Sequence, residues 1–411
     1  MTCLPAHRRT IGCCISLVPA LLATACGSDS ESRIEPFLCD DSLRTAFAPD
    51  ADTTVTLVKP FRKGESLALA DTPPMPTPPV AEEDICMVKV NVGPGNPGPD
   101  GAPSTSPGIG IEVWLPTAEN WNGRVHVLGG GGWAGGTAIS SVTVIGAAGA
   151  ARVAGTEGAV SAQTDTGHTI NNGSFAVDPD GNINTALWRD FSERAIHQMA
   201  VAAKALADGF YGTPATRSYW DGCSTGGRQG LKEAQVQPAD FDGILSFAPA
   251  INWTKFIVAE LYPQIVIQRD LGGVPLTTEQ VRLVSAAAVS ACDASVTGEH
   301  DGHVTDHSAC RYDPASDPAV LCATDGGKNS DTASCLTGAQ ATAVNKIWYG
   351  QTMDGTVPPP DADNGFGALP AANQLWFGIT RGSFIGGDLT TGGDFGLASS
   401  VAGEPAPFPI E

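Results

Sequence analysis

The stretch SYWDGCSTGGRQGLKEAQVQ (residues 218–237) decides the fold prediction, because it joins a short strand to a helix through a glycine-rich turn. Gly222, Ser224 and Gly226 form the motif G-x-S-x-G, and a helix is predicted from Gly227 until Pro238 stops it. A strand, this motif and a helix are the setting of a nucleophile elbow, which exposes a serine hydroxyl. The stretch predicts Ser224 as a catalytic nucleophile. The alternative is a glycine-rich turn that only packs against the sheet.

An attacking serine needs donors for the oxygen that becomes negative during ester cleavage. The backbone N–H of Thr225, directly after the serine, is the first predicted donor. The run Gly129–Gly132 follows a predicted strand (residues 124–128), and the backbone N–H of Gly132 is the second predicted donor. These two groups form the predicted oxyanion hole.

Strands alternate with helices through the first part of the chain. Apolar and alternating runs predict strands, and helical spacing predicts a helix over residues 191–210. The predicted strands span residues 87–92, 109–115, 124–128, 158–163, 218–220 and 243–248. This order predicts an α/β fold, with a doubly wound, mostly parallel sheet covered on both faces.

After about Asn252 the pattern changes. Helices are predicted near residues 277–291 and 338–349, and a segment rich in Cys, Asp and Gly lies between them without sheet signals. We interpret residues 39–251 as the core and residues 252–411 as a cap, or lid, inserted over the active edge of the sheet. Trp376 and Phe377 in this cap are candidates for contact with an aromatic substrate, or for the cap's own core.

The N-terminus has the pattern of a signal peptide. Arg8 and Arg9 precede an apolar run (residues 11–23), which is too short to span a membrane. Residues 1–25 are the predicted signal peptide, residues 26–38 a polar tether, and Cys26 a candidate for lipidation; ordinary cleavage near Ala25 is the alternative. We therefore expect an exported protein that is periplasmic, extracellular or lipid-anchored at a bacterial cell envelope.

The net charge of −21 argues against nucleic acid and anionic membranes as partners, because phosphates repel such a surface. A small or neutral substrate fits this charge, and contact with a membrane is expected only through a lipid on Cys26. No sequence feature indicates an organic cofactor.

Cysteines in an exported protein are expected to pair. Sequence proximity favours the pairs Cys292–Cys310 and Cys322–Cys335, and Cys39 and Cys86 bracket an N-terminal loop. Seven cysteines follow Cys26, so one is left over, and it is Cys223, beside the serine.

A general base for Ser224 is not evident. In hydrolases with this elbow the chain order is serine, then Asp or Glu, then His. The downstream candidates are His300, His303 and His307, all between Cys292 and Cys310. Upstream, we interpret His126, His168 and His197 as structural, although His168 follows a strand and is a candidate for lining the cleft. None occupies the position expected of the base.

The sequence resembles the tannase and feruloyl esterase family of α/β hydrolases from about Cys39 to Tyr349. The segment GCSTGGRQGLKEAQVQPADFDGILSFAPAINW (residues 222–253) carries most of the resemblance, with LGGGGWAGG (128–136), TDTGH (164–168) and CDASVTGEHDGHVTDHSACRYDP (292–314) in support. The resemblance implies an α/β-hydrolase fold with a cap. It also implies an acyl-enzyme mechanism on esters of aromatic acids such as gallate or hydroxycinnamate.

The resemblance further implies a triad in which a disulfide joins the cysteine before the serine to a cysteine after the histidine. Cys223 and Ser224 match the first half, but no histidine in this chain is followed by cysteine. The family's aspartate and His-Cys pair come after the cap, and this chain ends at Glu411. We therefore expect a C-terminally truncated member with an incomplete triad and little activity. A separately encoded remainder, a non-catalytic exported protein that binds aromatic esters, and a decayed gene product are the alternatives.

The cap segment also resembles the family's calcium loop. Asp293 and Asp301 match its carboxylates, and the backbone carbonyls of Glu299 and His303 match its other ligands. A middle aspartate is replaced near Thr297, which should weaken a Ca²⁺ site built from oxygen ligands. An acidic loop held by a disulfide is the alternative, and the irregular spacing of the three histidines disfavours zinc.

Overall fold

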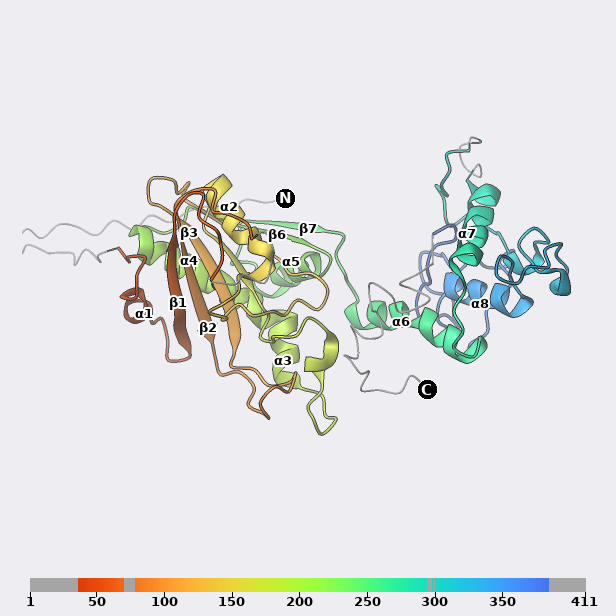
Figure 1. Ribbon diagram of the computed structural model, residues 1–411, viewed down its shortest axis with the longest axis horizontal. Coiled ribbons are helices and arrows are strands. Elements are labelled where there is room, and N and C mark those ends of the chain that lie inside the picture. The colour runs from red at the N-terminus through yellow and green to blue at the C-terminus, as the bar shows by residue number, and fades with distance from the viewer. Residues whose placement is uncertain (1–35, 70–77, 294–297, 299, 384–411) are drawn as a thin grey trace, which may run out of the picture. The chain divides into compact units, whose positions relative to one another are not determined.

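The computed structural model describes residues 36–69, 78–293, 298 and 300–383 (Figure 1). Its strands are β1 (Thr53–Phe61), β2 (Ile85–Val92), β3 (Ile109–Pro116), β4 (Arg124–Leu128), β5 (Ser161–Thr164), β6 (Arg217–Cys223) and β7 (Gly243–Phe247). Its α-helices are α1 (Leu43–Ala46), α2 (Gly149–Glu157), α3 (Thr185–Arg189), α4 (Ala195–Tyr211), α5 (Thr225–Val236), α6 (Trp253–Asp270), α7 (Thr278–Cys292) and α8 (Gly338–Tyr349).

Strands β1, β2, β3 and β5 pair antiparallel in that order, whereas β4, β6 and β7 pair parallel. The two groups meet where His126 N–H donates to Val160 O at 2.7 Å and Val160 N–H donates to Arg124 O at 3.0 Å. The predicted parallel pairing thus holds for the half that ends in Ser224. The first three strands follow one another without a crossover helix, which only parallel neighbours require.

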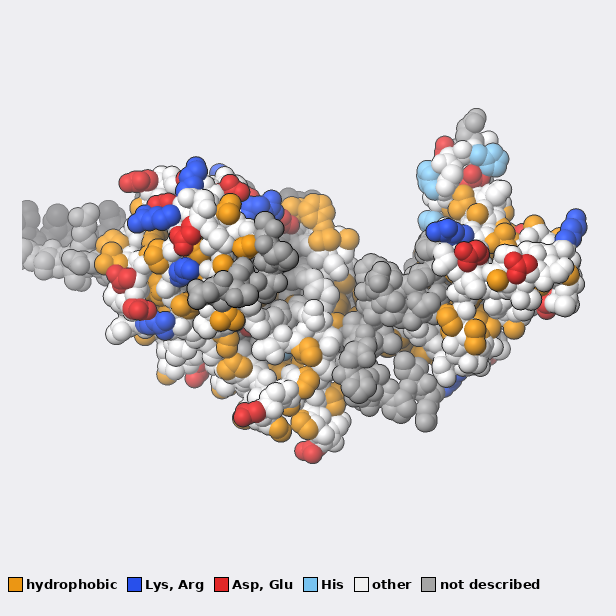
Figure 2. Space-filling model, viewed as in Figure 1, with side chains coloured by type: hydrophobic (Ala, Val, Ile, Leu, Met, Phe, Trp, Pro, Cys, Tyr) orange, Lys and Arg blue, Asp and Glu red, His pale blue; other side chains and the backbone are white. Residues whose placement is uncertain are grey.

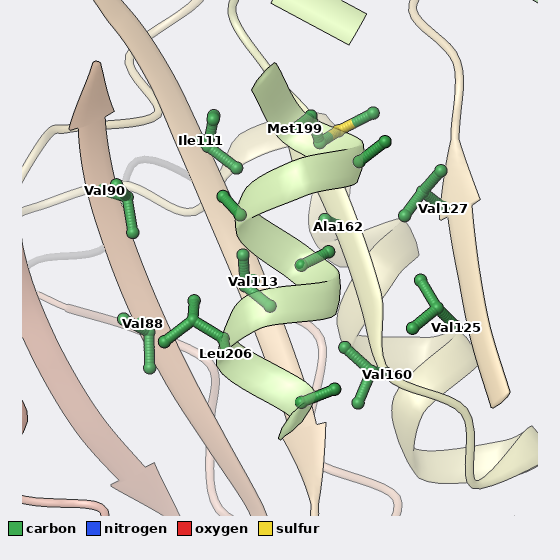
Figure 3. Close-up of a cluster of buried hydrophobic side chains, with 14 of the residues drawn as sticks. Val88, Val90, Ile111, Val113, Val125, Val127, Val160, Ala162, Met199 and Leu206 are labelled. Carbon is green, nitrogen blue, oxygen red and sulfur yellow. The ribbon is translucent and has the colours of Figure 1, made fainter. Parts of the chain in front are cut away.

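Alternation along the strands places apolar side chains on both faces of the sheet. On one face, Val88, Val90, Ile111 and Val113 pack under α4, whose Met199 and Leu206 lie against them, as Figure 3 shows. On the other face, Phe61, Met87 and Trp114 pack with the alanines of α2. Helices therefore cover both faces, which confirms the doubly wound α/β prediction.

A charged pair is buried on the α2 face of the sheet. Lys89 Nζ lies 3.0 Å from Glu112 Oε2, and neither side chain is exposed. Lys89 Nζ also donates to Thr143 O at 2.5 Å, Trp114 Nε1 donates to Glu112 Oε1 at 2.8 Å, and Ile145 N–H donates to Glu112 Oε2 at 3.2 Å. These bonds tie the segment before α2 to β2 and β3.

Residues 253–383, called the helical region here, contain α6, α7 and α8 around a small core. That core includes Val281, Val284, Val344 and Trp348. Helices α7 and α8 were both predicted, and in the structure each begins with a capping box, Thr277 with Gln280 and Thr337 with Gln340. Helix α6 was not predicted, because it contains Pro263 and has a weak apolar stripe.

The boundaries of the predicted core shift slightly in the structure. Phe37 packs against the main core, and its N–H donates to Gly209 O at 2.9 Å, so packing begins before residue 39. Trp253 and Ile257 of α6 pack with aromatic residues of the core, so packing also continues past residue 251. Whether the helical region acts as a cap stays a prediction.

The structure contains the three predicted disulfides, Cys39–Cys86, Cys292–Cys310 and Cys322–Cys335. Cys223 is free and exposed, as predicted. Disulfides form in oxidising compartments, which is consistent with export. Within the described ranges, the structure has no helix with the length and apolar character needed to cross a bilayer. The predicted signal peptide, Cys26 and most of the tether lie outside the described residues.

Candidate active site

Ser224 lies at the turn between β6 and α5, with φ 58° and ψ −116°. A positive φ is uncommon for a residue with a side chain and marks backbone strain. The turn is held by Ser224 N–H, which donates to Phe247 O at 3.1 Å, and by Ser224 O, which accepts the N–H of Arg228 and of Ala250 at 3.0 Å. Ser224 itself is exposed. This is the geometry of the predicted nucleophile elbow.

The glycines around Ser224 permit close contact between the segments that form the elbow. A Cβ added to Gly222 would lie 2.5 Å from the backbone of Gly226, and one added to Gly227 would lie 2.3 Å from Phe247 O. A Cβ on Gly226 would lie 3.0 Å from Gly130 O, in the glycine-rich loop after β4. The motif is therefore required by packing as well as by the turn.

The loop after β4, residues 129–138, lies beside the first turn of α5. Gly130 N–H donates to Gln229 Oε1 at 3.0 Å, and the Thr225 hydroxyl donates to Gly132 O. Thr225 is the first residue of α5, so its N–H has no acceptor within the helix, and the helix dipole favours negative charge there. No described residue accepts a hydrogen bond from Gly132 N–H. The oxyanion role of Thr225 and Gly132 stays a prediction that this placement supports.

Aromatic side chains gather around Trp133 of this loop: Trp133 itself, Phe175, Trp188, Phe191 and Trp253. We call these five residues the aromatic cluster. Trp133 contacts all four others, with ring centroids 5.1 to 6.0 Å apart. Sequence reasoning missed this cluster because its members come from distant parts of the chain.

Arg228, one turn after Ser224, contacts the aromatic cluster. Its guanidinium carbon lies 4.6 Å from the Phe191 ring centroid and 5.1 Å from the Trp253 centroid. Burial lowers the pKa of Arg228 to about 10. Cation–π contact on two rings offsets part of the loss of water around the charge. This residue was also missed, although it stands inside the quoted motif.

The described histidines form contacts away from Ser224. His126 Nδ1 lies 2.8 Å from Glu157, and His197 Nδ1 lies 2.7 Å from Asp240. His168 is buried, and its Nε2 lies 2.9 Å from Trp133 O, so it does not line an open cleft. In the described part of the chain, no hydrogen bond joins a histidine to the Ser224 hydroxyl.

The three downstream histidines belong to the segment after α7. Histidine side chains gather on this part of the visible face in Figure 2. His300 Nδ1 lies 2.5 Å from Asp293 Oδ1, and His303 Nδ1 lies 3.3 Å from Asp301 O. His307 Nδ1 is buried without a hydrogen-bond partner. None of these contacts identifies a base for Ser224.

The predicted calcium loop is only partly covered, since Glu299 and residues 294–297 lie outside the described residues. Asp293 is buried at the end of α7, and its carboxylate contacts His300. The described residues contain no group of three metal-ligating side chains. Six to eight oxygens surround a protein-bound Ca²⁺, so the described residues do not by themselves fit the ion, and calcium stays an untested prediction.

Two other features bear on where a ligand could bind. A cavity of about 730 Å³ includes Lys204, Arg217 and Asp242 in its lining. Arg217 begins β6 and Asp242 precedes β7, so this cavity lies at the opposite end of these strands from the elbow. Trp376 and Phe377 contact each other, with ring centroids 5.4 Å apart, and Lys255 of α6 lies 5.2 Å from the Trp376 ring.

Comparison with known proteins adds a family to this geometry. The sequence profile described as "Tannase and feruloyl esterase" matches residues 99–374. A probable feruloyl esterase of Arthroderma benhamiae is 37% identical over 288 residues, which are 69% of this chain and 48% of that protein. Probable feruloyl esterase B-1 of Aspergillus oryzae is 32% identical over 291 residues, again 69% and 48% of the two chains. This chain thus spans about half the length of these relatives.

Solved structures agree with the sequence comparison. The crystal structure of feruloyl esterase B from Aspergillus oryzae superposes with a TM-score of 0.65 at 26% identity, covering 92% of this chain and 66% of that one. An esterase from the same organism gives a TM-score of 0.62 at 25% identity, covering 88% and 64%.

Proposed function

Because this chain belongs to the tannase and feruloyl esterase family, we propose that it is a carboxylic ester hydrolase module that acts on esters of aromatic acids. The observation that carries the proposal is the strained, exposed Ser224 at the strand-to-helix turn. A positive φ at a residue with a side chain marks backbone strain, and such strain is concentrated at functional sites. Feruloyl esters are the substrates that the names of its relatives indicate.

In the proposed reaction, the Ser224 hydroxyl attacks the ester carbonyl carbon and expels the alcohol, leaving an acyl group on Ser224. The carbonyl oxygen becomes negative in the transition state. The N–H groups of Thr225 and Gly132 stabilise that oxygen, and the N-terminus of α5 adds its dipole. Water then releases the aromatic acid from Ser224.

The proton of Ser224 needs an acceptor, and the described residues do not show one. We propose that the 411-residue chain turns over esters slowly, because oxyanion stabilisation and binding alone retain only a small part of serine hydrolase catalysis. Export with or without a lipid on Cys26, and structural Ca²⁺ near Asp293, also remain proposals. A non-catalytic protein that binds aromatic esters is the second candidate, which the absence of a described base at Ser224 favours.

Stopped-flow mixing with 4-nitrophenyl acetate and with methyl ferulate tests the proposal. We expect one equivalent of acyl group on Ser224, detected by mass spectrometry, followed by slow release. Ser224→Ala should remove the adduct and leave the fold unchanged. Full turnover by this chain would contradict slow turnover and would point to a base such as His300, His303 or His307. Binding of methyl ferulate without any adduct would support the non-catalytic alternative.

A further inference from the structure

The loop that carries Gly132, residues 129–138, is held from two sides. On the α5 side, Gln229 accepts Gly130 N–H at 3.0 Å, and the Thr225 hydroxyl donates to Gly132 O. These bonds fix the first half of the loop beside Ser224. The second half has separate contacts.

His168 provides those contacts. Its backbone carbonyl accepts Gly136 N–H at 3.1 Å, and its ring Nε2 lies 2.9 Å from Trp133 O. A carbonyl oxygen only accepts, so Nε2 carries the hydrogen. Nδ1 lies 3.4 Å from the Thr166 hydroxyl, which is able to donate to it. The neutral Nε2–H tautomer thus satisfies the ring, and one residue binds the loop at both Trp133 and Gly136.

The surroundings hold the ring in this orientation. The His168 side chain stacks on Phe175 with ring centroids 3.9 Å apart, and Phe191 lies with its centroid at 6.0 Å. His168 is 1% exposed, and burial lowers its pKa to about 4, so the ring is neutral near pH 7. A neutral ring avoids burying a charge without a partner.

Asp165 fixes the segment on which His168 lies. Its Oδ1 accepts Gly110 N–H at 2.8 Å and Gly167 N–H at 2.9 Å, and its carboxylate also accepts the N–H of Ala138, at the end of the loop. A Cβ added to Gly110 would lie 2.1 Å from Asp165 Oδ2, so only glycine leaves room for this carboxylate. Asp165 therefore joins β3, the His168 turn and the loop.

The loop also passes unusually close to the His168 turn. Gly135 has φ +77°, and a Cβ there would lie 2.4 Å from Ile170 O and 3.1 Å from His168 Cδ2. The approach is compatible only with glycine at this position. The contact between the loop and the His168 turn thus depends on a residue from each segment, Gly135 and His168.

From these contacts we propose that His168 is a positioning residue for ester cleavage: its ring and backbone fix residues Trp133–Gly136 and thereby hold Gly132 N–H in place for the oxyanion. The inference rests on the proposed function, because an oxyanion hole matters only if Ser224 attacks an ester. His168 touches no substrate in this scheme and transfers no proton. Its effect passes through the backbone of the loop.

Hydrogen–deuterium exchange of the full chain tests the positioning without requiring activity. His168→Ala should accelerate exchange in residues 129–138 by up to about tenfold, the effect expected from the loss of one hydrogen bond. His168→Gln, whose amide N–H can replace Nε2–H, should restore slow exchange. Met199→Ala, on the buried face of α4, is the control for general loss of stability. Equal exchange of the loop in His168→Ala and Met199→Ala would overturn the proposal.

The rate at which a fluorophosphonate labels Ser224 tests whether positioning serves the chemistry. His168→Ala should label about 100-fold more slowly, as expected when an oxyanion donor is displaced, and His168→Gln should recover most of the rate. His126→Gln, which removes an exposed His–Glu contact, should label normally. Normal labelling of His168→Ala despite faster loop exchange would overturn the proposal. If no variant is labelled, including the wild type, the proposed function fails and the exchange result alone decides whether His168 positions the loop.

Discussion

The Ser224 elbow and the loop between Asp293 and Cys310 carried the two chemical predictions of this sequence, and they are stabilised in different ways. The elbow is held by backbone contacts so close that its glycines cannot take a side chain. The Asp293–Cys310 loop is closed by one disulfide, and Asp293 at its start faces His300. Tight backbone packing requires glycines at fixed positions, and these can be recognised in the sequence. A disulfide constrains only its two cysteines, so the sequence between them predicts little about the geometry.

The same contrast extends to the surroundings. The core contains a buried ion pair in which each charge has a partner, Lys89 with Glu112. The helical region depends on two disulfides and a smaller apolar core. Variants that remove one type of support should therefore affect one region and leave the other intact.

The largest effect is expected from breaking the buried ion pair of the core. Lys89→Met leaves Glu112 buried without its cation, which should cost about 3–5 kcal/mol of unfolding free energy. Urea denaturation followed by tryptophan fluorescence measures this change. The double variant Lys89→Met with Glu112→Leu should recover much of the loss, and failure to recover would show that packing rather than charge dominates at this site.

The next effect should be confined to the helical region. Replacing Cys292 and Cys310 by serine removes a loop closure of 18 residues, which is worth about 3 kcal/mol in the unfolded chain. Hydrogen exchange should accelerate in α7 but not in β6 or α5. The matched control replaces Cys39 and Cys86, whose disulfide belongs to the core. Faster exchange of the elbow in the Cys292/Cys310 variant would mean that the two regions are not independent.

A pair of helical glycines compares the two regions directly. Gly227→Ala in α5 places a methyl group 2.3 Å from Phe247 O, so it should cost about 1–3 kcal/mol and slow acylation of Ser224. Gly338→Ala in α8 meets only an Asp325 oxygen at 3.2 Å and should be nearly neutral. For each variant, thermal unfolding measures the change in stability and the burst amplitude measures the acylation of Ser224. Equal destabilisation by the two changes would contradict the special tightness of the elbow.

The smallest net effect is a pH dependence of the unfolding free energy, which arises from Asp165 and His168 beside the loop of residues 129–138. Burial raises the pKa of Asp165 to about 7, so this group favours the folded state most at low pH and loses that contribution as pH rises from 4 to 7. Burial lowers the pKa of His168 to about 4, so its contribution is present above 6.5 and is lost as pH falls toward 4. The two slopes oppose each other, each by at most about 1.4 kcal/mol per pH unit.

Single variants should reveal the two pH dependences of stability, which offset each other in the wild type. As pH rises from 4 to 7, the stability of Asp165→Asn should increase relative to that of the wild type. As pH rises from 4 to 6.5, the stability of His168→Gln should decrease relative to that of the wild type. Chemical denaturation at several pH values measures both differences. Parallel stability profiles for wild type and both variants would show that neither group titrates differently in the folded state.

Sequence reasoning predicted the elements whose signals are local. Helices were predicted near residues 277–291 and 338–349, where α7 and α8 lie, and G-x-S-x-G between a strand and a helix indicated the elbow. It missed α6, where Pro263 and weak amphipathicity hide an 18-residue helix. It also missed the antiparallel pairing of β1, β2 and β3, which depends on contacts between strands rather than on the pattern within each one.

The candidate site shows the same division. The position of Ser224 at a strand-to-helix turn and the free Cys223 agree with the sequence, since motif and cysteine count are properties of the chain alone. The aromatic cluster, its contact with Arg228, and the contact of His168 with Trp133 were not predicted, because each joins segments that are not adjacent in the sequence. A ring that binds a carbonyl and one that lines a cleft give the same letter in a sequence.

Covalent labelling tests directly whether Ser224 is a reactive nucleophile. The intact 411-residue chain and Ser224→Ala are each incubated with a fluorophosphonate and analysed by peptide mass spectrometry, with circular dichroism to confirm that both are folded. If Ser224 is the nucleophile, we expect a phosphonyl adduct on Ser224 and none in Ser224→Ala. A folded wild-type chain without an adduct, or an adduct that persists in Ser224→Ala, would contradict it.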